Sequence, residues 1–251
     1  MIVVALLALL MGLSLGMVAG GGSILAVPLL HHVCNLPLQQ ALATSLVIVA
    51  SASLVAGISF AKRGFVDFRC VWILVATSAV TAFGTSLLSS CFDDRLILFA
   101  FVGMMLMTGF GMLRDRLERH EDSEGVPPVL QRSRILAWGV LIGGVTGIVG
   151  VGGGVLITPI LHLFCRLPLR TSIGTSLWII TANSVAGVFG RLSFVSVDAP
   201  SLLSVGVPAV TGCLLGVCWG QRFSSRVLRR VVGWIVMATA GLMMAVEFWH
   251  I

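Results

Sequence analysis

The sequence predicts an all-α integral membrane protein with two inverted-topology repeats, each a broken re-entrant helix hairpin followed by three transmembrane helices. The chain is 57% hydrophobic and only 10% charged, whereas a soluble domain has about 25% charged residues. Its apolar stretches are ~15–22 residues long, as membrane-spanning helices require. Two glycine runs, at 20–22 and 152–154, interrupt apolar segments at equivalent places in the two halves.

An internal repeat relates the two halves of the chain. When residues 21–67 are compared with 152–198 without gaps, 17 of 47 positions are identical. The matches include Gly, Pro, His, Cys, Thr-Ser and Asp, which chance similarity between leucine-rich segments does not explain. We therefore predict a first repeat at 1–113, a charged cytoplasmic linker at 114–134 and a second repeat at 135–251.

Each repeat begins with a segment that glycine and proline interrupt, because both residues weaken a helix. The broken segments are 2–34 and 135–165. The unbroken spans that follow are predicted at 38–61, 70–91, 95–113, 169–190, 200–220 and 227–249.

The positions of the 16 Lys and Arg residues decide whether the broken segments cross the membrane. If each crossed once, nine basic residues would lie on one side of the membrane and seven on the other, and this division does not determine the orientation of the protein. If each turns back as a hairpin, they divide fourteen to two, with only Arg95 and Arg191 on the poorer side. We therefore expect re-entrant hairpins, opposite orientations of the two repeats, a cytoplasmic linker and both termini on the outer side of the membrane.

The two glycine breaks are the first candidate for a substrate site. A helix that restarts inside the membrane presents unpaired N–H groups and a partial positive charge to an anion. Such a restart is expected near Ser23 and near Gly154, and close packing of small residues is the alternative explanation. The candidate residues are Gly20, Gly21, Gly22, Ser23 and Pro28 in the first half, and Gly152, Gly153, Gly154 and Pro159 in the second.

Hydroxyl and amide side chains lie at a similar predicted depth. Thr44, Ser45, Thr175 and Ser176 follow helix-starting prolines by seven or eight residues, ~10–12 Å along a helix. They can donate to an anion, or bond to backbone carbonyls and neighbouring helices. Asn183 lies two turns further on and has Ala52 as its counterpart, so it indicates either an asymmetric ligand or a bridge between helices.

Four further pairs or single residues have two interpretations each. His31 and His162 either relay protons or cap the second arm, and we favour the cap. Cys34 and Cys165 either contact a ligand or pack as small apolar residues, and we favour packing. We expect Asp67 and Asp198 to cap helices or lie at the surface, and Arg191 to flank an outer vestibule or only to fix topology.

The motifs resemble those of the sulfite exporter TauE/SafE family of bacterial membrane permeases. GGGSILAVPLL with ALATSL in the first half, and GVGGGVLITPIL with SIGTSL in the second, carry the resemblance. The resemblance extends over nearly the whole chain and implies movement of sulfite, sulfonates or other small organic anions. It also implies a bacterial inner membrane, in which both termini would face the periplasm.

The sequence thus predicts a secondary transporter, an exporter or permease, for a small anion such as sulfite, an organosulfonate or a related sulfur oxyanion. A channel-like anion pore and a non-transporting membrane scaffold or maturation protein are the alternatives. Nucleotide-binding and hydrolase motifs are absent, so we expect neither an enzyme nor a cofactor. Carboxylates are scarce in the spans, and no metal site is expected. The expected partners are a small anionic substrate and the lipid bilayer, with no nucleic acid. The sequence is also compatible with a homo-oligomer.

Overall fold

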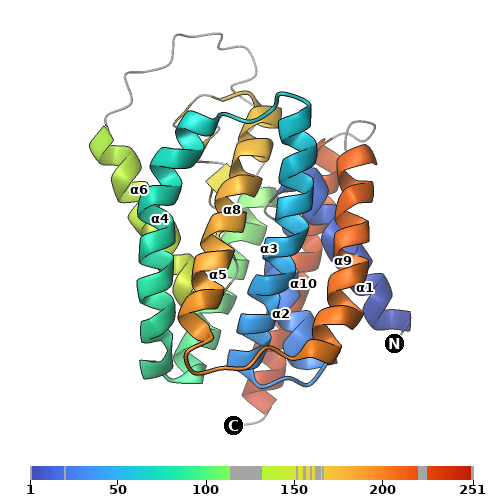
Figure 1. The fold of residues 1–251 in the computed structure, drawn as a ribbon. Helices are drawn as coiled ribbons and strands as arrows, with labels where there is room; N and C mark the ends of the chain where they lie inside the picture. Colours follow the sequence, from blue (N-terminus) through green and yellow to red (C-terminus); the bar gives the residue numbers. More distant parts are fainter. Residues whose placement is uncertain are drawn as a thin grey trace.

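The described part of the computed structural model is a bundle of helices. It covers residues 2–19, 21–113, 132–150, 152–154, 157–158, 160–161, 165, 167–219 and 225–249. No strand occurs within these ranges. The prediction of an all-helical protein is therefore confirmed for the described residues (Figure 1).

The first half begins with two helices that fold back on one another. α1 (Ile2–Val18) ends at Ala19, and α2 (Gly21–Pro28) continues into a π-helical turn, η1 (Leu29–Val33). The backbone φ of Ala19 is 60°, which reverses the chain direction between α1 and α2. A Cβ on Gly22 would collide with the α1 backbone, at 2.7 Å from the Leu15 nitrogen, so this glycine permits the close contact.

Three long helices complete the first half, and three occupy equivalent places in the second. They are α3 (Leu38–Lys62), α4 (Phe68–Leu88), α5 (Asp94–Leu113), α8 (Leu169–Arg191), α9 (Ala199–Trp219) and α10 (Ser225–Trp249). A short 3-10 turn, η2 (Ser89–Cys91), follows α4. Each of the six predicted spans overlaps one of these helices, with boundaries that differ by at most three residues.

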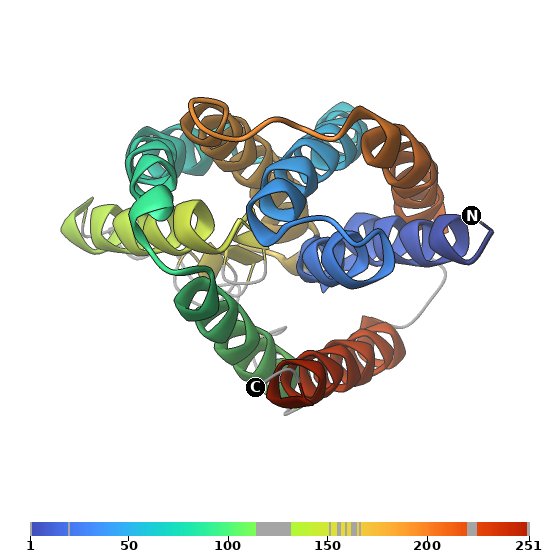
Figure 2. The same cartoon turned by 90° about the horizontal axis from the view of Figure 1, so that it is seen from below.

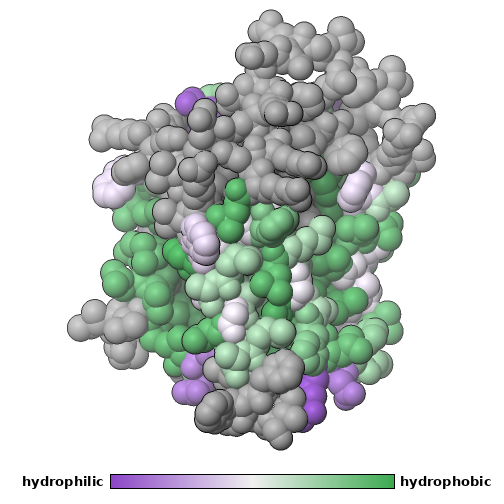
Figure 3. Space-filling view, turned by 180° about the vertical axis from the view of Figure 1, so that it is seen from behind, coloured by the Kyte–Doolittle hydropathy of each residue, from purple (hydrophilic) through white to green (hydrophobic). Residues whose placement is uncertain are grey.

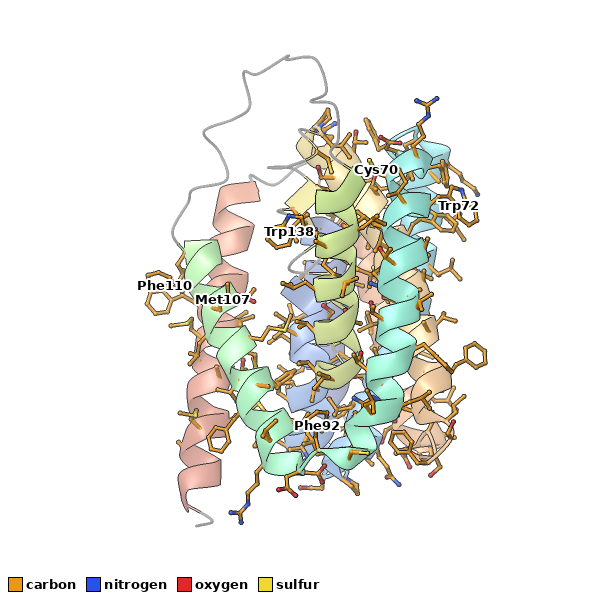
Figure 4. The ribbon with its side chains drawn as sticks, turned by 90° about the vertical axis from the view of Figure 1, so that its left-hand side faces the viewer. Cys70, Trp72, Phe92, Met107, Phe110 and Trp138 are labelled. Carbon is orange, nitrogen blue, oxygen red and sulfur yellow. The ribbon has the colours of Figure 1, made fainter. Side chains whose placement is uncertain are left out.

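Five of these helices are long and apolar enough to cross a membrane, namely Leu38–Lys62, Phe68–Leu88, Asp94–Gly111, Arg170–Arg191 and Ala199–Trp219. In α10 the apolar part, Gly233–Ala245, is shorter. On the face seen in Figure 3, hydrophobic side chains cover the middle, and the most hydrophilic coloured side chains lie towards the two ends. Trp72 and Met107 are 73% and 74% exposed and point away from the bundle (Figure 4). The molecule is a multi-pass membrane protein.

α3 and α8 lie side by side at the centre of one layer and run in opposite directions, α3 upwards and α8 downwards in Figure 1. α4 and α9 flank them. On the outer edges α1 packs against α9, and α6 (Arg132–Val149) packs against α4. α6 begins three residues before the predicted linker ends; linker residues 114–131 lie outside the described ranges.

α5 and α10 form a separate pair across the molecule (Figure 2). α2 fills the space between this pair and the main layer, and a core cluster joins it to both. Ile24 and Val27 of α2 belong to the same buried cluster as Phe101 of α5 and Val236 of α10. The broken segment is therefore enclosed by helices of both halves.

Glycines allow the outer helices to approach their neighbours closely. Gly12 and Gly16 of α1 lie against the α9 backbone at Ala209 and Cys213, and no Cβ fits at either glycine. Two glycines of α6 lie equally close to α4: Gly143 against Ser78, and Gly147 against Ala82. All four contacts coincide under the 131-residue offset of the repeat, which extends the correspondence of the two halves beyond residues 21–67. Small residues at helix interfaces permit such backbone approach in membranes.

Candidate functional site

The backbone is broken at the equivalent place in both halves. Ala19 has a φ of 60°, and its counterpart under the repeat, Gly150, has a φ of 70°. Gly152 and Gly153 also adopt the left-handed conformation, each with a φ of 68°. The predicted interruption therefore exists in both segments.

The first break differs in detail from the prediction. It lies at Ala19, one residue before the glycine run, and α2 starts at Gly21 rather than near Ser23. Gly21 and Gly22 belong to α2, and Gly22 lies against the α1 backbone. In the second half a helical residue follows the left-handed glycines at Gly154, as predicted. Gly20 and Pro159 lie outside the described residues.

The two breaks meet inside the bundle. A Cβ on Gly154 would lie 2.8 Å from the Ala19 carbonyl oxygen, so the second break touches the first directly. A Cβ on Gly152 would lie 2.8 Å from Ser184 Oγ of α8 and 3.0 Å from Val49 of α3. The structure thus brings two segments that are 131 residues apart to one buried place between α3 and α8.

Two predicted hydroxyl groups lie beside the broken arms. Ser45 donates to the Gly150 carbonyl at 3.1 Å and to the Leu42 carbonyl of its own helix at 2.8 Å. Ser176 donates to the Ile173 carbonyl at 2.8 Å and accepts from Thr158 Oγ1 at 3.1 Å. Both serines are fully buried. Their protons bond to backbone carbonyls, as the helix-bridging interpretation expects.

The two predicted threonines form hydrogen bonds between the two halves. Thr175 Oγ1 accepts from the backbone N–H of Asp67 at 3.0 Å, and Thr44 Oγ1 accepts from that of Asp198 at 3.4 Å. Each bond joins one half to the other, and the two bonds are equivalent under the repeat. Asp67 and Asp198 themselves accept backbone N–H groups at the starts of α4 and α9, so their predicted capping role is confirmed.

Asn183 lies in the buried centre of the bundle and is only partly satisfied. Its Oδ1 accepts from Ser78 Oγ of α4 at 2.7 Å. Its Nδ2 has no hydrogen-bond partner, nor has Ser184 Oγ, and both residues are completely buried. Unsatisfied buried polar groups are rare in folded proteins and often accompany a function.

Pro28 and His31 close the first arm. Pro28 is the last residue of α2, where the α-helix gives way to the π-helical turn. His31 Nδ1 lies 2.7 Å from the Leu36 carbonyl oxygen, just past the arm, which favours the capping interpretation. His162 lies outside the described residues.

The matched cysteines have equivalent surroundings. The thiol of Cys34 lies beside the Ser201 side chain, and that of Cys165 beside Cys70; Ser201 and Cys70 are themselves matched under the repeat. Burial raises the pKa of the Cys34 thiol. A thiol that holds its proton is a weak nucleophile, in agreement with a packing role.

Arg191 does not lie in an outer vestibule, which was one of its two interpretations from the sequence. Its side chain is completely buried. It donates to Gln39 Oε1 at 2.7 Å and to the carbonyls of Gly147 and Ile148 at 3.0 and 2.9 Å. These carbonyls end α6, immediately before the second break. The expectation of a vestibule residue is wrong, because the guanidinium group is used to cap a helix.

Sequence reasoning also missed Ser184 as a site residue. In the repeat it matches Ser53, so the sequence gives no sign that its environment differs. The structure distinguishes it by the contact with Gly152 and by the absence of a hydrogen-bond partner for its Oγ.

A bundle of apolar helices whose broken arms meet at a buried polar centre defines the class of multi-pass membrane transporters. The chain belongs to the sulfite exporter TauE/SafE family, whose profile matches residues 4–243.

Curated relatives carry transporter names. A "probable membrane transporter protein" of Xylella fastidiosa (strain 9a5c) is 32% identical over 240 residues, covering 92% of this chain and 90% of the relative. YdhB of Bacillus subtilis (strain 168), with the same description, is 26% identical and covers 96% and 98%. MJ0441 of Methanocaldococcus jannaschii is 24% identical and covers 89% and 87%. No solved structure matches the chain.

Proposed function

We propose that this protein is a secondary transporter that moves a small anion, such as sulfite, an organosulfonate or a related sulfur oxyanion, across the bacterial inner membrane. The observation that carries the proposal is the meeting of the two breaks, Ala19 against Gly154, beside buried neutral donors of α8. The start of α2 at Gly21 adds the partial positive charge of a helix N-terminus. The family name adds sulfite to the candidate substrates.

The proposed architecture is a pair of inverted-topology repeats with re-entrant hairpins. It is supported by the opposite directions of α3 and α8 (Figure 1). It is also supported by contacts that recur under the 131-residue offset: the two Thr–Asp hydrogen bonds and the glycine contacts of α1 and α6. α1 folds back onto α2 through Ala19, as a hairpin that does not cross requires.

In the proposed orientation the linker faces the cytoplasm and both termini face the periplasm. The fourteen-to-two division of basic residues supports it. So does the arrangement of the helices, because α1 begins and α10 ends in the lower part of the molecule, opposite the end of α5 and the start of α6 (Figure 1). A membrane-impermeant thiol reagent applied to one side distinguishes the arrangements, since Cys91 and Cys218 are both exposed and would lie on opposite sides.

Rocking of one repeat against the other would expose the shared site to each side in turn. The contacts that move must join the halves, and the Thr44 and Thr175 bonds are of this kind. The glycine contacts of α1 with α9 and of α6 with α4 also join the halves. We propose that one half moves against the other at these contacts.

The test is flux of sulfite, thiosulfate, methanesulfonate, sulfate and acetate into proteoliposomes. We expect saturable uptake of at least one of these anions by the wild type. Gly22→Leu and Gly153→Leu should abolish it, because no side chain fits at either glycine, one beside the first break and one within the second. Gly103→Leu is the matched control, since nothing lies within 4 Å of that glycine. Normal uptake in both break variants would refute the site, and no uptake of any anion by the wild type would refute the proposed substrate class.

A further inference from the structure

The centre of the bundle is asymmetric at one pair of matched positions. In the first half Ser53 Oγ donates to the Val49 carbonyl at 2.6 Å and bonds to Thr181 Oγ1 at 2.9 Å. Its counterpart in the second half, Ser184, is equally buried and has no partner for Oγ. The preceding residue continues the difference, because Asn183 stands where the first half has Ala52.

The unsatisfied groups lie at the second break. Ser184 Oγ is the nearest atom to the position that a Cβ on Gly152 would take, at 2.8 Å. Gly152 also has a φ of 68°, a left-handed backbone conformation that residues other than glycine rarely adopt. Leaving a buried hydroxyl or amide without a partner is unfavourable to folding. Of the matched residues Ser53 and Ser184, only Ser184 carries that cost.

Charge limits what these groups can bind. Every Lys and Arg of the sequence lies at or beyond the ends of the spans. The nearest on α8, Arg191, is eight residues beyond Asn183, ~12 Å along the helix. Its guanidinium group is already bonded to α6 and Gln39. This cation lies against the α6 carbonyls just before the break, where it offsets their partial negative charge, and the described side chains nearest Gly152 are neutral.

A site of neutral donors favours a single negative charge. The free energy of taking an ion out of water grows with the square of its charge, so a dianion requires a nearby cation that a monoanion does not. Hydroxyl and amide donors, with backbone N–H groups, suffice to stabilise a monoanion.

From this asymmetry we propose that Ser184 and Asn183, with the Gly152 break, form a one-sided subsite that binds an oxygen of a singly charged oxyanion and rejects dianions. The proposal rests on the proposed transport function, and it names the residues and the charge state that the function leaves open. The ligand would supply the acceptor that Ser184 Oγ and Asn183 Nδ2 lack.

The test uses the purified full chain and measures both ligand affinity and thermal unfolding, with methanesulfonate as the monoanion and sulfate as the dianion. Ser184→Ala should weaken methanesulfonate binding by roughly tenfold to a hundredfold, the loss of one hydrogen bond to a charged group. Its unfolding temperature should stay at or above that of the wild type, because Ser184 Oγ has no bond to lose. Asn183→Ala tests the amide by the same affinity measurement.

Ser53→Ala is the matched control and should behave in the opposite way. It should lower the unfolding temperature, because it removes two hydrogen bonds, and leave methanesulfonate affinity within twofold. The wild type should bind methanesulfonate at least tenfold more tightly than sulfate. Equal affinity of wild type and Ser184→Ala would overturn the subsite, and equal affinity for the two anions would overturn the charge preference. A wild type that transports none of the tested anions would instead refute the proposed function.

Discussion

The buried guanidinium group of Arg191 gives the most direct test of how the second break is held in place. It donates to three acceptors, Gln39 Oε1 and the carbonyls of Gly147 and Ile148, with distances between 2.7 and 3.0 Å. Gln39 also donates to Asp94 Oδ1 at 2.8 Å. One arginine therefore joins the starts of α3 and α5 to the end of α6.

Arg191→Met keeps most of the side-chain volume and removes all three hydrogen bonds. A hydrogen bond to a charged group contributes about 1.5–3 kcal/mol, so the three bonds together contribute roughly 4.5–9 kcal/mol. Removal of the desolvated charge, whose Nε has no partner, offsets part of this loss. We expect a net loss of about 3 kcal/mol. At about 2–4 °C for each kcal/mol in a chain of this size, the unfolding temperature should fall by roughly 6–12 °C.

The assay is thermal unfolding of the purified protein, followed by tryptophan fluorescence. Arg191→Lys keeps the charge with fewer donors in fixed positions, and it should lose an intermediate amount. Arg95→Met is the control, since this arginine is exposed and directly follows Asp94, which bonds to the same Gln39. A change below about 1 °C in Arg191→Met would show that the guanidinium bonds do not stabilise the fold, and the reasoning would fail.

Three further predictions concern packing, the contacts between halves, and pH. Gly143→Ala should lower the unfolding temperature by several degrees, because its Cβ would collide with the Ser78 carbonyl; Gly144→Ala, with nothing within 4 Å, should leave it unchanged or raise it. Thr44→Val and Thr175→Val should each lose about 1 kcal/mol in denaturant unfolding, whereas Thr211→Val, whose exposed hydroxyl bonds within its own helix, should change stability by less than about 0.5 kcal/mol. The Ser201 hydroxyl and backbone N–H lower the pKa of Asp198; its stabilising contribution is therefore complete above pH about 4 and is lost as pH falls through the lowered value. The unfolding temperature measured from pH 6 to 3 should consequently fall less steeply in Asp198→Asn, and equal slopes would contradict the pKa assignment.

The elements were predictable from sequence because membrane helices carry strong signals. The spans are uninterrupted apolar stretches bounded by charges or prolines, and α3 and α8 begin immediately after Pro37 and Pro168, as expected. The breaks were predictable because glycine runs are rare inside such stretches. The exact break residue in the first half was not, since alanine at position 19 gives no local indication of a positive φ.

The contacts that build the site were beyond sequence reasoning. The Thr175–Asp67 bond, the burial of Arg191 and the unpaired Ser184 all depend on which residues meet across more than 30 positions of sequence. The position of a serine or threonine in the sequence predicts its approximate depth in the membrane, but it does not show whether the hydroxyl proton has a hydrogen-bond acceptor. Ser45 and Ser184 illustrate the difference: the first donates to Gly150, and the second lies beside Gly152 without a partner.

Counterflow in proteoliposomes tests most directly whether both breaks form one site of a carrier. Vesicles loaded with unlabelled substrate, the best of the anions from the flux screen, are diluted into a trace of labelled substrate. We predict a transient accumulation of label in wild-type vesicles, since a carrier exchanges substrate through one site, and no accumulation in Gly22→Leu or Gly153→Leu vesicles. Accumulation that persists in both variants, or wild-type vesicles that conduct the anion without any overshoot, would contradict the account.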